Sequence, residues 1–150
     1  MKALVVYESM HGNTQAVAEA IANKLKEKGS VQVLKVDQLP AVKWDAVDLL
    51  VMGCPTYAFN MPPSVQKILK GLPKNTLADV QVAAFDTKMN LFGKFNNAAS
   101  KLDKVLRKLG GKSVLSPQNF IVLDKEGPLA EGELARAEAW AEEILAALQK

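Results

Sequence analysis

Residues 5–22 read VVYESMHGNTQAVAEAIA, and this stretch decides the fold. It starts within the apolar run of residues 3–7 (ALVVY), which predicts a short strand buried on both faces. Apolar side chains then recur at helical spacing over residues 13–28, and Gly29 follows, which predicts an amphipathic helix. A buried strand followed by such a helix is typical of proteins with a parallel sheet.

The rest of the chain continues this alternation. Strands are predicted at residues 31–36, 48–53, 80–85 and 120–123, with residues 113–115 joined to the last, and helices at 64–70, 95–109 and 133–148. A loop over residues 38–44 is predicted in place of one crossover helix. The sequence therefore predicts an α/β fold, a doubly wound five-stranded parallel sheet with helices on both faces, in a single domain over residues 1–150.

Composition limits the classes of function. The 150 residues carry 19 Lys and Arg against 16 Asp and Glu, a formal charge of +3 that is too small and scattered to favour nucleic-acid binding. Cys54 is the single cysteine and His11 the single histidine, which excludes a disulfide framework and the common multi-Cys and multi-His metal sites. No apolar run approaches the roughly 20 residues of a membrane span. We expect a cytoplasmic protein without a metal.

The loop at residues 8–14 (ESMHGNT) is the first candidate site. Ser9 and Thr14 are hydroxyl residues on either side of Gly12, and the loop ends at a helix N-terminus, where unpaired N–H groups favour an anion. The two hydroxyls and the N–H groups from Met10 to Thr14 can hold a terminal phosphate without a basic side chain. An ordinary helix cap with a turn is the alternative.

Other catalytic patterns are absent from the sequence. There is no G-x-G-x-x-G after the first strand and no G-x-x-x-x-G-K-[ST]. Asn60 stands where a cysteine-dependent phosphatase using Cys54 would need an arginine, and a lone His11 disfavours a Ser-His-Asp hydrolase. In open α/β sheets ligands bind outside the carboxyl ends of the strands. The segments after the first, third and fourth strands are therefore the ones to consider.

These three segments resemble those of flavodoxin-like FMN-binding proteins. The phosphate loop is SMHGNT at residues 9–14, the turn after the third strand is GCPTYAF at 53–59, and the segment after the fourth strand is FDTKMN at 85–90. The resemblance covers nearly the whole chain, and the lack of a long insertion in the fifth strand is similar to short-chain flavodoxins. It implies a three-layer sandwich with sheet order 2-1-3-4-5 and non-covalently bound FMN rather than FAD, since no extra adenine site is evident.

The resemblance implies a set of cofactor-binding residues and no catalytic residue. They are Ser9, Met10, His11, Gly12, Asn13, Thr14, Pro55, Thr56, Tyr57, Ala58, Phe59, Asp86, Thr87, Lys88 and Met89. Tyr57, and next Phe59, is expected against the flavin ring, although Phe59 could instead plug the core. Lys88 is expected near N1 and O2, where a cation favours the negative charge that accumulates on reduction, with a solvated lysine as the alternative.

The sequence leaves two interpretations open for several side chains. His11 stands where a hydroxyl is frequent, and its ring either reaches the phosphate or faces solvent. Cys54 is expected to be structural rather than a redox centre. The outer flavin face is either open or covered by one of three apolar residues. Those residues are Met89, Leu91 and Phe92.

Packing, capping and surface charge account for other conspicuous side chains. Trp44 and Trp140 are expected to pack in the core, and Asn96 and Asn97 to cap a helix. A charged set is expected to form a solvated helix face, or else a docking patch. That set is Lys101, Asp103, Lys104, Arg107 and Lys108.

The implied function is electron transfer by FMN between a reductase and a redox acceptor, which are partner proteins or a small molecule. An FMN-dependent quinone or protoporphyrinogen-type oxidoreductase is the alternative, because residues 53–69 (GCPTYAFNMPPSVQKIL) also resemble quinone reductases of this fold. A binding module without flavin is the third. Flavodoxins as a group are acidic, so the charge of +3 predicts a less negative second reduction potential and different partners.

Overall fold

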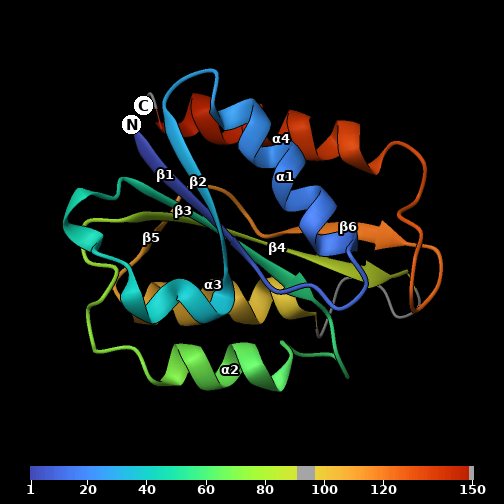
Figure 1. Cartoon of the computed structure of the whole chain (residues 1–150), viewed down its shortest axis with the longest axis horizontal. Coiled ribbons are helices and arrows are strands. Elements are labelled where there is room, and N and C mark those ends of the chain that lie inside the picture. The colour runs from blue at the N-terminus through green and yellow to red at the C-terminus, as the bar shows by residue number, and fades with distance from the viewer. Residues whose placement is uncertain (91–96, 149–150) are drawn as a thin grey trace.

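The structure is a computed structural model that describes residues 1–90 and 97–148. Its elements in chain order are β1 (Lys2–Tyr7), α1 (Asn13–Leu25), β2 (Ser30–Lys35), η1 (Val36–Ala41), η2 (Trp44–Ala46), β3 (Leu49–Pro55), α2 (Pro63–Lys70), β4 (Gln81–Met89), α3 (Ala98–Lys108), β5 (Lys112–Ser113), β6 (Gln118–Val122) and α4 (Glu133–Leu148). Figure 1 shows three layers, with α1 and α4 on one face of the sheet and α2 and α3 on the other.

The sheet is parallel and has the order β2-β1-β3-β4-β5, with β6 also paired to β4. β5 pairs with Gln81 and Val82 at the start of β4, and β6 pairs with residues 85–89 further along it. Two short strands thus share the fifth position, and the chain between them contains Pro117, which has no N–H to donate to a ladder. The predicted α/β fold with order 2-1-3-4-5 is confirmed, with its last strand interrupted.

Helices on both faces explain the continuous apolar runs of the central strands, at residues 3–7, 49–52 and 82–85. On β1, Leu4 and Val6 belong to the core beneath α2 and α3, whereas Ala3 and Val5 belong to the core beneath α1 and α4. This alternation follows from the two-residue period of a strand. The same strands contribute side chains to both cores. Packing on both sides of the sheet therefore holds the ends of these strands in place.

The aromatic residues of one core depend on a glycine. Phe85, Phe120 and Trp140 pack edge to face with ring centroids 5.9–6.1 Å apart. Gly53 of β3 lies under the Phe85 ring, where a Cβ atom would come within 2.1 Å of it. Trp140 is buried as expected, and Trp44 packs against the other core while partly exposed.

Most predicted boundaries differ by a few residues from those of the structure. The helix predicted for residues 13–28 ends at Leu25, because its apolar stripe ends there and the next amides form tighter turns, Glu27 N to Lys24 O and Lys28 N to Leu25 O. The loop predicted at 38–44 overlaps two short 3₁₀ helices, η1 and η2. The helix predicted from residue 95 begins at Ala98, and Phe95 lies outside the described residues.

The two ends of the described chain lie close together. Met1 and Leu148 line the same shallow hollow, beside Asp48 and Gln81 at the amino end of the sheet. Figure 1 shows this end opposite the tips of β4 and β6. Among the described residues, no helix is both long and apolar enough to cross a membrane.

Candidate functional site

A cavity of about 340 Å³ opens at the carboxyl ends of the central strands. Its walls come from the loop after β1, the turn after β3, the end of β4 and the segment after β6. Its volume lies within the usual range for small-molecule sites, and its place is the one where open α/β sheets bind ligands.

The cavity brings together all but three of the residues predicted to bind a cofactor. Its described lining is Ser9, Met10, His11, Asn13, Thr14, Pro55, Thr56, Tyr57, Ala58, Thr87, Lys88, Met89, Val122 and Lys125. The three predicted residues outside this lining are Gly12, Phe59 and Asp86. Of the side chains considered as covers for the outer flavin face, Met89 lines the cavity, and Leu91 and Phe92 lie outside the described residues.

The loop before α1 presents several amide groups. Gly12 has φ 88°, a left-handed conformation that favours glycine, and its N–H donates to Ser9 Oγ at 3.0 Å. Within the described residues, the N–H groups of Met10, His11, Asn13 and Thr14 donate to no acceptor. Since they lie at the N-terminus of a 13-residue helix, they form a favourable environment for an anion.

A hydrogen bond between two threonines forms the bottom of the cavity. Thr14 Oγ1 and Thr87 Oγ1 are 2.7 Å apart, and both side chains are buried. A hydroxyl offers one donor and two acceptor positions. If Thr87 donates to Thr14, the Thr14 hydroxyl keeps its own proton available for an anion in the cavity.

The segment predicted as a loop after the fourth strand is part of that strand. β4 continues to Met89 because β3 pairs with it as far as Thr87 and β6 pairs with it from Phe85 to Met89. Side chains therefore alternate along this segment. Thr87 lines the cavity, while Asp86 points away from it into the protein.

Asp86 joins three elements behind the cavity wall. Its carboxylate accepts hydrogen bonds from Thr56 Oγ1 at 2.9 Å, from Ala99 N at 3.0 Å and from Asn119 Nδ2 at 2.8 Å. Burial raises the pKa of this carboxyl, and the three hydrogen bonds and the charge of Lys88 oppose that rise. The structure thus assigns Asp86 to holding Thr56 and the start of α3 in place.

The turn after β3 carries the exposed aromatic residues. Tyr57 and Asn60 exchange backbone hydrogen bonds of 2.7 and 2.9 Å across a two-residue turn. Its central residues, Ala58 and Phe59, have φ of 47° and 66°, the pattern of a type I′ turn. Tyr57 lines the cavity, whereas Phe59 is outside the lining and 48% exposed, so it does not plug the core.

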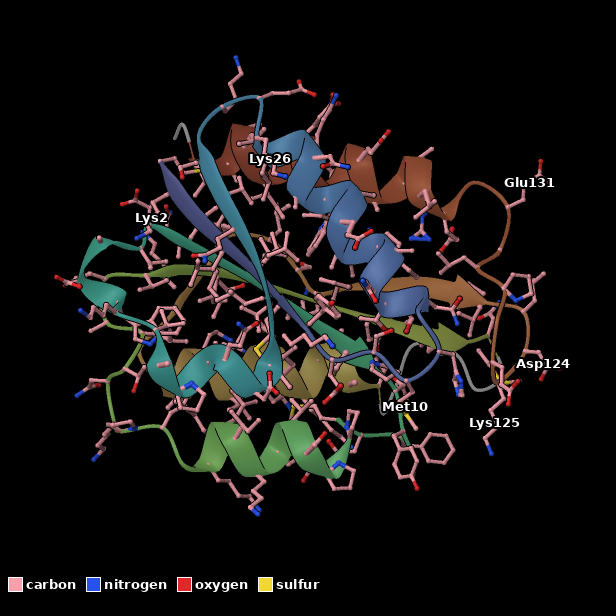
Figure 2. The ribbon with its side chains drawn as sticks, viewed as in Figure 1. Lys2, Met10, Lys26, Asp124, Lys125 and Glu131 are labelled. Carbon is pink, nitrogen blue, oxygen red and sulfur yellow. The ribbon has the colours of Figure 1, made fainter. Side chains whose placement is uncertain are left out.

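Positive charge surrounds the cavity. Lys88 comes from β4 and Lys125 from the segment between β6 and α4, and no described lining residue is acidic. Asn13 Nδ2 donates a hydrogen bond to Glu126 O at 3.2 Å. This bond holds the segment that contains Lys125 next to the loop before α1. Figure 2 shows Met10 and Lys125 at the same end of the molecule, opposite Lys2 and Lys26.

Sequence reasoning missed Val122 and Lys125. No motif marks the segment after the last strand, which is anchored by backbone hydrogen bonds from Leu123 N to Pro128 O and from Ala130 N to Ile121 O. The sheet order could have indicated it, because the carboxyl end of the fifth strand must lie beside that of the fourth.

Two other expectations concern single side chains. Cys54 is buried in a hydrophobic core, and its burial raises the pKa of the thiol, followed by the charges of Asp86 and Glu8. This environment suits a structural cysteine rather than a reactive one. Asn97 caps α3 by accepting a hydrogen bond from Ser100 N at 3.0 Å, and Asn96 lies outside the described residues.

Comparisons with known proteins agree with this architecture. Oxidised flavodoxin 2 of Bacillus cereus superposes with a TM-score of 0.83 at 21% identity, over 97% of this chain and 99% of that one. An uncharacterised protein of Methanocaldococcus jannaschii is 30% identical over 118 residues, which are 75% of this chain and 29% of that protein. The NADPH-dependent diflavin oxidoreductase 1 of Danio rerio is 30% identical over 119 residues, 75% of this chain and 20% of that protein.

The chain thus spans less than a third of the length of these two curated relatives. The flavodoxin family model matches residues 5–146, which include every strand after the start of β1 and nearly all of α4. Together with the sheet order and the cavity at the carboxyl ends of the strands, this match identifies the chain as a member of the flavodoxin family.

Proposed function

We propose that this protein binds FMN non-covalently in the cavity and transfers electrons between a reductase and a redox acceptor in the cytoplasm. The observation that carries the proposal is the set of amides without a described acceptor at the N-terminus of α1, which open into the same cavity as Tyr57. Amides at a helix N-terminus bind a phosphate by donating hydrogen bonds to it, and an aromatic side chain stacks against a flat ring system.

Each wall of the cavity has a distinct part in this proposal. The N–H groups of Met10, His11, Asn13 and Thr14, with the hydroxyls of Ser9 and Thr14, would hold the phosphate. Tyr57 packs against the ring system and excludes water from it. The bound group supplies the redox chemistry, and the chain provides its orientation and its electrostatic surroundings.

Positive charge near the ring favours its reduced, negatively charged form. Lys88 and Lys125 line the cavity, and the whole chain has a charge of +3. A cation near the ring raises the second reduction potential, since the reduced form gains more from it than the oxidised form. We therefore expect a second potential less negative than that of an acidic flavodoxin, which a redox titration measures. A very low value would contradict this part of the proposal.

The first experiment is a titration of the purified apoprotein with FMN, riboflavin and FAD. We expect a complex with FMN at micromolar concentration or below, with visible absorbance typical of a bound flavin. Riboflavin should bind more weakly, because it lacks the phosphate. Failure to bind FMN at micromolar concentration would refute the proposal. Equal affinity for riboflavin would show that the loop before α1 does not bind the phosphate.

An FMN-dependent oxidoreductase acting on a quinone or a protoporphyrinogen-type substrate is the alternative, and a second experiment separates it from a carrier. The FMN-loaded protein is mixed with NADH or NADPH and a quinone in a stopped-flow instrument. A carrier shows slow reduction until a reductase is added. Fast turnover by the protein alone would favour the enzyme.

A further inference from the structure

The helices on the two faces of the sheet carry opposite charge. α2 and α3 together contain six Lys and Arg residues and one Asp, whereas α1 and α4 contain five Glu residues, one Lys and one Arg. The small net charge of +3 therefore hides a separation of charge across the sheet. A molecule with this distribution is oriented by the field of a charged partner.

The lysines of α2 and α3 recur three or four residues apart, which places them on one side of each helix, and we term the two sets together the lysine face. It comprises Lys67, Lys70, Lys101, Lys104 and Lys108. All except the half-buried Lys101 are exposed, while Asp103 is buried and paired with Arg107 at 3.0 Å. Like charges at i,i+3 and i,i+4 destabilise a helix by a few tenths of a kcal/mol per pair, so helix stability does not explain this pattern.

The lysine face reaches the edge of the cavity. A groove of about 240 Å³ runs between α2 and α3, and its walls combine Lys70 and Lys101 with the apolar Met61, Leu69 and Val105. Lys101 Nζ donates to the carbonyl of Phe59 at 2.8 Å. Phe59 adjoins Ala58, which lines the cavity, so the lysine face begins one residue from the cavity wall.

We propose that the lysine face docks an acidic redox protein, whose negative surface covers α2 and α3 and brings its redox centre to the turn at Tyr57–Phe59. This inference rests on the proposed function, because it names the partner of the same cavity. The apolar groove favours a protein over a nucleic acid, since it offers the apolar centre and charged rim of a protein interface. The acidic α4 on the opposite face would repel the same partner and so orient it.

The test uses one electron acceptor in two charge forms. Cytochrome c is basic, and succinylation of its lysines makes it acidic while the same haem accepts the electron. The FMN-loaded protein is photoreduced without oxygen, with EDTA as the electron donor that is oxidised. It is then mixed with each form, and one electron passes from the reduced protein to each ferric haem, which becomes ferrous. At low ionic strength we expect the acidic form to react about tenfold faster, with salt abolishing the difference. A faster reaction with the basic form would overturn the proposal.

Two matched double variants separate docking from overall charge. K67E/K104E reverses one charge on each helix of the lysine face, and K26E/K28E reverses two charges just after α1, across the sheet from that face, where Figure 2 places Lys26. All four residues are exposed. We expect K67E/K104E to slow the acidic acceptor about fivefold or more and K26E/K28E less than twofold, with FMN affinity unchanged in both. If both variants slowed the acidic acceptor equally, only the net charge of the protein would affect the reaction rate. That result would refute the lysine face as a docking surface.

A measurement without flavin keeps this inference separate from the proposed function. The apoprotein is immobilised, and the binding of acidic cytochrome c, basic cytochrome c and a short DNA duplex is recorded as salt is raised. Preferential binding of the acidic cytochrome, lost in K67E/K104E, supports the lysine face even if no flavin binds. Tighter binding of DNA, lost in the same variant, would assign the face to a nucleic acid and overturn the proposal.

Discussion

At the bottom of the cavity Thr14 and Thr87 are buried and share a hydrogen bond, whereas at its edge Met10 and Tyr57 are 54% and 49% exposed. We term the buried group of Thr14, Thr87 and the supporting Asp86 the floor, and the exposed group of Met10, Tyr57 and Lys125 the rim. Each floor residue is held by a partner from another element. Folding therefore fixes the side chains of the floor, while those of the rim are exposed to solvent. The following predictions test this division.

Removing the Asp86 carboxylate should have the largest effect. Asp86→Ala leaves one buried and two part-buried donors without their acceptor, which should lower the free energy of unfolding by about 3 kcal/mol. Urea denaturation measures the change. The matched control is Asp103→Ala, because Asp103 is also buried but its partner Arg107 is 53% exposed and can be solvated. Equal losses would show that Asp86 has no special part in the floor.

Thr14→Val should mainly affect phosphate binding. Loss of a hydrogen bond to a charged group is worth about 1.5–3 kcal/mol, so FMN affinity should fall about tenfold to a hundredfold or more. Riboflavin affinity should change much less. Parallel titrations with both flavins measure this, and thermal denaturation records the cost of losing the bond to Thr87. Equal weakening of both flavins would show that the phosphate site is misplaced.

The pH dependence of stability should reveal the buried Asp86. Its pKa is raised above the ordinary 3.8, so the folded state holds this proton over a range where the unfolded state has lost it. The contribution is complete below pH 3.8 and is lost as pH rises through the raised pKa, at about 1.4 kcal/mol per pH unit. Denaturation from acid to neutral pH should show this fall in the native chain and not in Asp86→Asn. If the free energy of unfolding changed with pH in the same way in the native chain and in Asp86→Asn, Asp86 would not cause the fall.

At the rim, Tyr57→Ala should weaken FMN binding and leave stability nearly unchanged. Aromatic stacking contributes about 0.5–1.5 kcal/mol, so the dissociation constant should rise about twofold to tenfold. Phe59→Ala is the matched control, since Phe59 has similar exposure two residues away but does not line the cavity. If the two variants weaken FMN equally, Tyr57 is not the stacking residue.

Lys125→Gln should have the smallest effect. Exposed charge pairs contribute about 0.2–1 kcal/mol, so FMN affinity should fall less than about fivefold, and the loss should vanish at high salt. Lys26→Gln, at the far end of the molecule, provides the control (Figure 2). A loss that persists at high salt would indicate that Lys125 is a buried ligand rather than part of the rim.

The sequence predicted two of the three residues of the floor and two of the three of the rim, and it failed at Asp86 in the floor and at Lys125 in the rim. Periodicity predicted the alternation of strands and helices, the residues around Gly12 indicated the loop before α1, and the resemblance to flavodoxins implied the sheet order. Asp86 was misplaced because a carboxylate after an apolar run is typical of a loop. Its burial depends on Asn119, Thr56 and the start of α3, which are distant in sequence.

Lys125 was missed for a related reason. It lies in a segment without a motif, and only the pairing of β6 with the far end of β4 brings that segment to the cavity. Local patterns predict the type and order of the elements, with ends that differ by a few residues from those of the structure. They do not predict which polar side chain will be enclosed once several elements meet.

The shared hollow of Met1 and Leu148 has a consequence for how this fold tolerates rearrangement. Because the start of β1 and the last described turn of α4 are neighbours, a short Gly/Ser linker can join them without crossing the sheet. New chain ends can then be opened in the mostly exposed connection at residues 71–75, between α2 and β4. Such a circular permutant would keep every wall of the cavity, and the same geometry lets a second domain be attached at this end while the entrance of the cavity stays open.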